Sequence, residues 1–235
     1  MFDKPWLDMP ISDNGETLQT LPPEIARVKP HPYAQLGAPY HQASPHCLRR
    51  GVLRRLLAVQ GQLQQHRPGW RLRVFDAYRP NAVQQFMVTH TYTDLRAKQP
   101  HLSERELWDM VYTFWAQPSE DPATPPAHST GAAIDLTLQD EKGHELDMGT
   151  PIDEFSPRAH PEYFADKPEH GGIQRNRMLL RTLMLDHGFA QHPAEWWHFS
   201  YGDQLWAWRQ LAASGQRHNA VYGRADLVST PQQPA

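Results

Sequence analysis

Apolar residues recur at helical spacing in several parts of the chain. Val52, Leu56 and Val59 lie three or four residues apart, the interval that places side chains on one face of an α-helix. Polar and charged residues fill the remaining positions of the same stretch, as in a helix with one solvated face. Comparable patterns predict helices over residues 48–66, 80–92, 103–116, 173–187 and 203–213.

Several of these helix ends carry local signals. Ser103 and Glu106 form a capping-box pair, and Asp203 can cap the last helix. Gly188 suits the position just beyond a helix, which often needs a left-handed backbone. Pro80 is expected at the first helical position, where a missing N–H loses no hydrogen bond.

Strict alternation replaces helical spacing in the centre of the chain. From residue 134 to residue 138 the apolar side chains point to one face, whereas Asp135 and Thr137 point to the other. Residues 70–76 alternate in the same way, which predicts a second strand with Asp76 on the face of Leu72 and Val74.

Two further strands and the fold class follow from the remaining pattern. The turn at Lys142-Gly143 predicts a return strand over residues 145–147, and residues 196–201 predict the last strand. These elements predict an α+β fold, with a small, mainly antiparallel sheet that carries the functional site and helices packed on its outer face.

Length and composition predict one domain. With 235 residues, the chain can bury one substantial core, so we expect a single catalytic domain over residues 1–215. Residues 216–235 are polar and are expected to form a flexible tail. The first forty residues are rich in proline and are expected to be extended or irregular, with room for a short strand. The tyrosines between residues 33 and 40 are expected to pack rather than to line a pocket.

Charge narrows the range of partners. A net charge of -3 gives no electrostatic reason to expect nucleic acid or an anionic membrane. A single cysteine, Cys47, cannot form an internal disulfide. The N-terminus shows neither the pattern of a signal peptide nor an apolar stretch long enough to span a membrane, so we expect a cytoplasmic protein. No feature predicts an oligomeric state.

A histidine and an aspartate flank the turn before the central strand. Asp135 can point away from the core, and a turn containing Gly131 can bring His128 back beside it. His198 supplies a third candidate ligand. A strand aspartate is more often bonded to a loop than to a metal, and the chain has 14 histidines. The combination of His, Asp and His is nevertheless a recurrent catalytic zinc set that leaves one position open for water, which predicts one Zn²⁺ per chain.

Glu195 offers a carboxylate that the metal does not need as a ligand, which suits a general base. Glu195 and His198 are three residues apart, so an ideal strand would direct them to opposite faces. Because Pro193 interrupts any strand that precedes it, we expect Glu195 to lie before the last strand rather than at a bulge. His160 and His170 are further ligand candidates that no spacing favours.

The order and spacing of these residues resemble the motifs of a known enzyme superfamily. The motif His128-x-x-Gly131-x-Ala133-x-Asp135, followed by Glu195-x-x-His198, resembles the zinc D,D-peptidase superfamily of D-alanyl-D-alanine dipeptidases and D,D-carboxypeptidases. Segments 76–80, 135–138 and 148–153 favour the dipeptidase branch, the VanX-like enzymes. The resemblance runs from about residue 71 to about residue 201, and its motifs keep the order of the family.

The resemblance implies a substrate and two more roles. It implies zinc-dependent hydrolysis of the D-alanyl-D-alanine dipeptide to two D-alanines. Arg79 would stabilise negative charge on the scissile carbonyl, as a guanidinium fixed at the end of a strand can do; the alternative is an ordinary salt bridge. Asp153 would bind the free amine of the substrate. The alternatives are that Asp153 caps a helix or turn and that Glu154 binds the amine instead.

One position departs from the family. Relatives often carry a serine two residues before the first histidine, where this chain has Pro126, which offers neither a hydroxyl nor a backbone donor. Either amine binding depends on fewer groups, or the preferred dipeptide differs. Recycling of wall fragments, use of D-alanine as a nutrient and glycopeptide resistance are all compatible with the same site.

Three other functions remain open at this point. A D,D-carboxypeptidase that acts on longer peptidoglycan peptides would use the same metal set. A non-haem iron oxygenase also uses two histidines and a carboxylate, although its histidine and carboxylate are typically two residues apart rather than seven. A non-catalytic zinc-binding module would need neither Glu195 nor Arg79.

Overall fold

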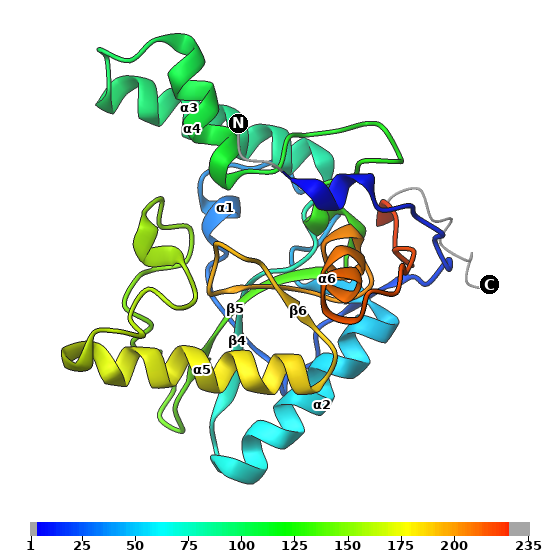
Figure 1. The fold of residues 1–235 in the computed structure, drawn as a ribbon, viewed down its shortest axis with the longest axis vertical. Coiled ribbons are helices and arrows are strands. Elements are labelled where there is room, and N and C mark those ends of the chain that lie inside the picture. The colour runs from blue at the N-terminus through cyan, green and yellow to red at the C-terminus, as the bar shows by residue number, and fades with distance from the viewer. Residues whose placement is uncertain (1–3, 226–235) are drawn as a thin grey trace.

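The computed structural model describes residues 4–225 (Figure 1). Its short 3₁₀ helices are labelled η. In chain order the elements are η1 (Pro5–Asp8), β1 (Leu18–Thr20), β2 (Ala26–Arg27), α1 (Pro32–Gln35), β3 (Cys47–Arg49), α2 (Arg50–His66), β4 (Arg71–Asp76), α3 (Asn81–Lys98), α4 (Glu104–Phe114), η2 (Ala127–Thr130), β5 (Ala133–Gln139), η3 (Pro157–Ala159), η4 (Pro168–His170), α5 (Gly171–Asp186), β6 (Ala190–Gln191), β7 (His198–Ser200) and α6 (Gln204–Ser214).

A five-stranded sheet forms the centre of the fold. Its strands lie in the order β2-β4-β5-β7-β6, and each neighbouring pair is antiparallel except β2 with β4. Strands β1 and β3 form a separate antiparallel pair. A small, mainly antiparallel sheet with helices around it is the predicted α+β fold, which is confirmed.

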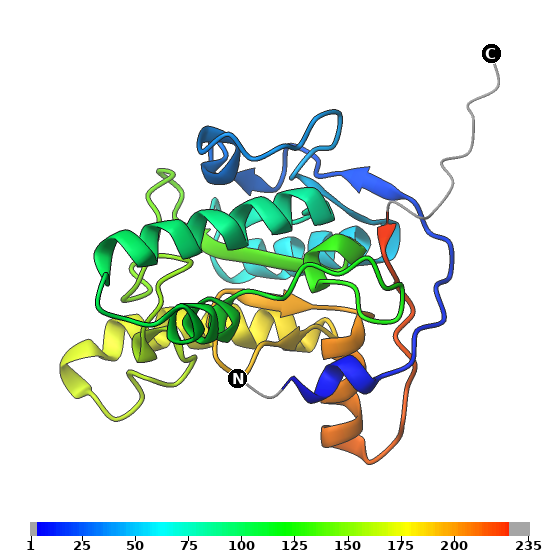
Figure 2. The same ribbon diagram turned by 90° about the horizontal axis from the view of Figure 1, so that it is seen from above.

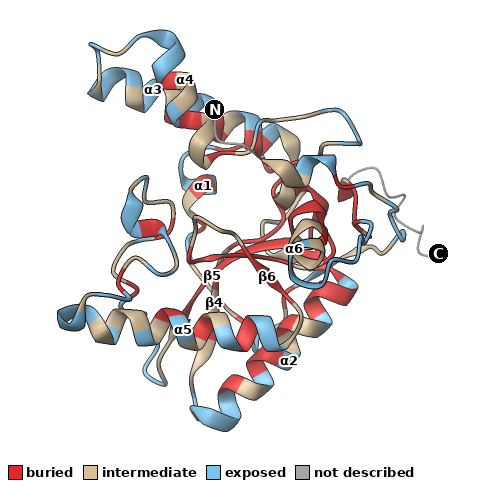
Figure 3. Ribbon diagram, in the orientation of Figure 1, coloured by how far each residue is buried: buried red, intermediate tan, exposed pale blue. Residues whose placement is uncertain are grey.

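Helices α2 and α5 lie side by side and cover one face of the sheet (Figure 1). Leu56 of α2 and Leu183 of α5 are buried in one cluster with Val74 and Leu136 of the sheet. Figure 3 shows buried residues concentrated in the sheet and exposed residues on the outer sides of these helices. The apolar faces predicted from helical spacing therefore form the core.

Helices α3 and α4 lie on the other side of the molecule and form a second cluster with α1. Seen from above, they lie in front of the sheet (Figure 2). Val88 of α3 and Val111 of α4 are buried there beside Tyr33. Tyr92 stacks on Trp108 with ring centroids 4.2 Å apart, which stabilises the end of α3 against α4.

A β-bulge changes the direction of one side chain in β4. Val74 pairs with Leu136, but the register shifts and Asp76 then pairs with Asp135. Directly opposed residues of antiparallel strands point to the same face, so Asp76 lies on the face of Asp135. The prediction that Asp76 shares the face of Leu72 and Val74 is wrong, because strict alternation does not include the extra residue of a bulge.

Three other elements differ from the prediction. Helix α3 begins at Asn81, because Pro80 has an extended ψ of 150° and caps the helix instead of joining it. The helix continues to Lys98, past the expected end at residue 92. Residues 145–147 form no strand, since Glu145 makes only an isolated bridge to Gln139. Residues 48 and 49 belong to β3, so α2 starts at Arg50.

The chain ends are packed onto the body where the structure describes them. Ala220 bridges to Ile11, and Ala220 and Tyr222 are buried, so ordered structure extends past the expected boundary at residue 215. The rest of the expected tail, residues 226–235, lies outside the described residues. Among residues 4–225, no helix combines the length and the apolar character needed to cross a lipid bilayer.

Arg49 joins both chain ends to the turn that precedes β5. Its side chain is fully buried, and its Nε donates to the carbonyl of Thr130 at 2.8 Å. Its Nη2 donates to Asp13 Oδ2 and to the carbonyl of Gly223, each at 2.9 Å. A guanidinium with its donors satisfied in this way is strongly held, and removing it leaves several buried acceptors without partners.

We expect Arg49→Met to lower the free energy of unfolding of the zinc-loaded protein by about 3 kcal/mol. Urea unfolding followed by tryptophan fluorescence measures the change. Arg50→Met is the matched control, because the Arg50 side chain is 68% exposed and its loss should change stability by less than about 0.5 kcal/mol. Equal stabilities of the two variants would contradict a structural role for Arg49.

Candidate active site

Three neighbouring strands place Asp76, Asp135 and His198 in one row across the sheet. The register pairs Asp135 with Asp76 on β4 and with His198 on β7. Apolar neighbours of Asp135 on β5 point into the core with α2 and α5, so the row lies on the opposite face. The alternation read from the sequence places Asp135 correctly.

His128 reaches this row from η2, just before β5. The turn after it needs a glycine for two reasons: Gly131 has a left-handed φ of 69°, and a Cβ there would lie 2.4 Å from a side-chain carbon of Leu18. The turn brings His128 Nε2 to 3.1 Å from Asp135 Oδ2. The predicted return of His128 toward Asp135 is therefore present.

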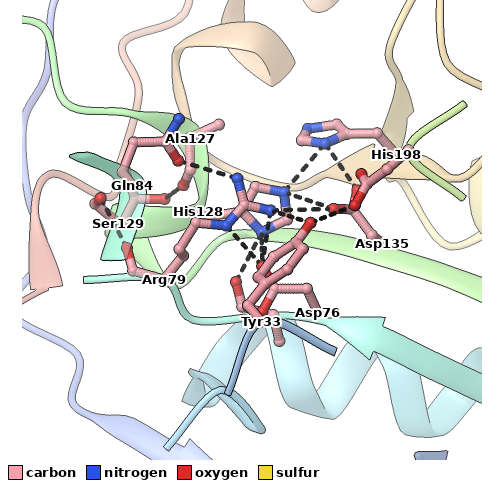
Figure 4. A network of polar contacts seen from close by, with 12 residues as sticks. Tyr33, Asp76, Arg79, Gln84, Ala127, His128, Ser129, Asp135 and His198 are labelled. Atoms are coloured by element: carbon pink, nitrogen blue, oxygen red, sulfur yellow. Dashed lines mark hydrogen bonds and ion pairs between the residues drawn. The ribbon is translucent and has the colours of Figure 1, made fainter. Parts of the chain in front are cut away.

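His128, Asp135 and His198 gather three potential metal ligands (Figure 4). His198 Nδ1 lies 3.1 Å from Asp135 Oδ1 and 3.3 Å from His128 Nε2, and the potential ligand atoms are all within 4.8 Å of one another. Asp135 Oδ1 is buried yet accepts no hydrogen bond from the described residues, an unfavourable state for a carboxylate oxygen without a cation. This nitrogen and oxygen set fits Zn²⁺.

Burial would raise the pKa of Asp135, but His128 and His198 hold it well below its usual range. The carboxylate is therefore ionised, which is the form that binds a metal.

Hydrogen bonds fix which nitrogen of each histidine is free. His128 Nδ1 donates to the carbonyl of Ala77 at 2.8 Å, which leaves Nε2 as the ligand atom. His198 Nε2 lies 3.3 Å from Ser200 Oγ, whose hydroxyl donates to Asp203 Oδ2 at 2.7 Å. His198 can therefore offer Nδ1. Ser200 was not predicted from the sequence, although a hydroxyl two residues from a strand ligand shares its face.

Glu195 lies beside the three ligands and precedes β7, as predicted from Pro193. Its Oε2 is 3.8 Å from His198 Nδ1, and its Oε1 is 3.7 Å from His192 Nδ1. Burial raises the pKa of Glu195 to about 7. A carboxylate with this pKa is well matched to proton transfer near neutral pH.

Arg79 is held rigidly beside this row (Figure 4). Its Nε donates to Asp76 Oδ2 at 2.8 Å and its Nη1 to Gln84 Oε1 at 3.0 Å. The guanidinium carbon lies 4.9 Å from the ring centroid of Trp115. Arg79 Nη2 also contacts the Tyr33 hydroxyl at 3.3 Å and Asp135 Oδ2 at 3.5 Å. Among the described residues this leaves the second Nη1 hydrogen without a partner, and Arg79 can offer it to a substrate oxygen. The bulge in β4 makes this possible, because it turns Asp76 toward the site.

Asp153 and Tyr33 form the other end of the site. Tyr33 donates its hydroxyl to Asp153 Oδ2 at 2.7 Å and accepts from Arg79 Nη2 at 3.3 Å. Asp153 has a φ of 66°, a left-handed conformation that residues other than glycine rarely adopt and that is frequent at functional sites. Burial raises the pKa of Asp153 to about 7, so a positive partner would favour its charged form.

Tyr33 packs as expected and does not line the cleft, but it has a second role that the sequence did not predict. Its ring is buried in the α1, α3 and α4 cluster, while its hydroxyl joins the polar network of the site. The sequence carries no local signal for this role, since 120 positions separate Tyr33 from Asp153.

All six predicted site residues line one cleft of about 860 Å³. They are Arg79, His128, Asp135, Asp153, Glu195 and His198. The other candidates, Glu154, His160 and His170, do not line it. Among residues 4–225, only His128, Asp135 and His198 form a group that could hold a metal ion.

Comparison with known proteins agrees with this geometry. Residues 26–218 match the family model Peptidase_M15, described as D-ala-D-ala dipeptidase. A D-alanyl-D-alanine dipeptidase of Synechocystis sp. is 46% identical over 95% of this chain and 97% of its own length. One of Streptomyces coelicolor is 32% identical over 63% of this chain and 72% of its own.

A solved structure was also matched. A mutant of the vancomycin resistance D,D-pentapeptidase VanY, in complex with Zn(II), gives a TM-score of 0.43 at 14% identity, covering 90% of this chain and 96% of its own.

Proposed function

This chain belongs to the D-ala-D-ala dipeptidase family, Peptidase_M15, and we propose that the six residues gathered in its cleft carry out the reaction of that family. The protein is a peptidase that hydrolyses D-alanyl-D-alanine to two D-alanines in a zinc-dependent reaction. The observation that supports the residue assignment best is the meeting of His128, Asp135 and His198 beside Glu195.

His128 Nε2, His198 Nδ1 and the Asp135 carboxylate would hold one Zn²⁺ per chain. When bound, Zn²⁺ supplies a Lewis acid that polarises the scissile carbonyl and makes water a better nucleophile near neutral pH. Ala77 and Ser200 keep the two imidazoles oriented through their second nitrogens.

Glu195 moves the proton. Its carboxylate takes a proton from the attacking water and then gives it to the nitrogen of the leaving D-alanine. Arg79 donates N–H groups to the carbonyl oxygen as negative charge develops there, and Asp76 and Gln84 prevent the guanidinium from turning away. Asp153 binds the free ammonium of the substrate. The Tyr33 hydroxyl donates a hydrogen bond to Asp153 Oδ2 and keeps this carboxylate in place.

The assay that tests this function measures D-alanine released from D-alanyl-D-alanine and from N-acetyl-D-alanyl-D-alanine by the zinc-loaded protein. We expect cleavage of the free dipeptide only, because Asp153 needs a positive partner. Cleavage of the acetylated form would favour a D,D-carboxypeptidase. No release from either compound would contradict the proposed activity.

The same assay tests Asp153. We expect Asp153→Asn to lower kcat/KM for the free dipeptide by about 100-fold, the range for losing one partner of a buried charge pair. Glu154→Gln is the control, because Glu154 does not line the cleft. Equal losses in both variants would contradict the assignment.

The cytoplasmic location expected from the sequence stays a prediction.

A further inference from the structure

The N-terminal segment of residues 4–9, which we call the strap, lies against α6 (Figures 1 and 2). Its residues 4–8 line the cleft. Gln204 Nε2 donates to the carbonyls of Leu7 and Met9, at 3.0 and 2.7 Å. Trp6 packs on His192 and Trp208, with ring centroids 5.5 and 5.7 Å away. The strap is therefore fixed to the body rather than merely adjacent to it.

The strap brings Lys4 into the wall of the cleft that contains His128 and Glu195. Lys4 Nζ donates to the carbonyl of Trp115 at 2.8 Å. An ammonium has three donors, and within residues 4–225 Lys4 forms no ion pair. Burial lowers the pKa of Lys4 and Glu195 raises it, so Glu195 is near enough to affect its charge.

A zwitterionic dipeptide needs a cation at its second end. Of the described residues that line the cleft, Lys4 and Arg79 are the only lysine and arginine. Arg79 is paired with Asp76 and contacts Tyr33 near Asp153, at the ammonium end. Pro126, which also lines the cleft, offers neither a hydroxyl nor an N–H. Lys4 is the cation left for the carboxylate.

We propose that Lys4 binds the free carboxylate of the substrate and thereby selects dipeptides with an unblocked C-terminus. This proposal rests on the dipeptidase function given above. The dipeptide would be recognised at both charged ends, by Asp153 at its ammonium and by Lys4 at its carboxylate. A charged hydrogen bond in a partly desolvated site discriminates strongly against a neutral end.

The test compares D-alanyl-D-alanine with D-alanyl-D-alaninamide, in the zinc-loaded wild type and in Lys4→Met. We expect Lys4→Met to lower kcat/KM for the acid by about 50-fold, mainly through KM, and to change the value for the amide by less than about 3-fold. Lys4→Arg should restore most of the loss. Lys98→Met is the control, because Lys98 is exposed and pairs only with Asp94.

Each outcome has a distinct meaning. Equal losses on acid and amide would show that Lys4 only holds the strap, and an unchanged KM for the acid would show that it does not touch the substrate; either result overturns the proposal. A wild type that cleaves neither compound would instead contradict the dipeptidase function. Calorimetric binding of both compounds to zinc-loaded Glu195→Gln, with and without Lys4→Met, gives the same comparison without turnover.

Discussion

Replacing Glu195 with Gln should lower kcat by about 10³-fold while the protein keeps one zinc ion per chain. The amide has the size of the carboxylate but cannot accept the proton of the attacking water. Glu195 is not one of the three residues whose potential ligand atoms gather within 4.8 Å of one another. Steady-state kinetics and zinc analysis by mass spectrometry measure the two quantities separately.

The size of this effect distinguishes a general base from a residue that only shapes the cleft. Glu154→Gln provides the matched control, since Glu154 does not line the cleft, and it should keep wild-type turnover. If Glu195→Gln retained more than about a tenth of the wild-type kcat with full zinc, another group would have to move the proton.

Replacing Asp135 with Ala should remove both zinc and activity. Asp135 supplies the carboxylate that lies 3.1 Å from His128 Nε2 and 3.1 Å from His198 Nδ1. Loss of a residue that hydrogen-bonds to a metal ligand typically weakens metal affinity by about 10–100-fold. Loss of the ligand itself should therefore weaken zinc affinity by more than about 100-fold. Competition with a chromogenic zinc chelator measures the affinity.

An isosteric variant adds information about charge. Asp135→Asn keeps the shape of the side chain but removes the negative charge, so zinc binding should still fall sharply. Asp166→Asn is the control, because Asp166 is exposed and lies outside the cleft. A full zinc complement in Asp135→Ala would show that the metal is held by other residues.

The order of these effects follows from what each residue contributes. In the proposed mechanism Asp135 holds the metal, Glu195 moves the proton, and Asp153 and Lys4 bind the two ends of one small substrate. The variants should therefore separate into loss of zinc, loss of kcat and loss of affinity. That pattern cannot arise from general destabilisation, which Arg49→Met is expected to produce instead.

Local patterns predicted that His128 and Asp135 lie close together. His128 and Asp135 are separated by one turn, and a turn with an obligatory glycine reverses the chain over a few residues. The alternation in β5 placed Asp135 on the face away from the core, and Pro193 correctly placed Glu195 before β7. The helices could be predicted from the spacing of apolar residues, because a helix at the surface of a globular protein buries one apolar face.

Only the tertiary structure showed which distant residues contact the site residues and line the cleft. The bulge in β4 turns Asp76 toward Arg79, and strict alternation could not show it. Tyr33 reaches Asp153 across 120 positions, and Lys4 reaches Trp115 across 111. Periodicity gives the face on which a side chain lies and not the segment it meets there, because that choice depends on how distant elements pack together.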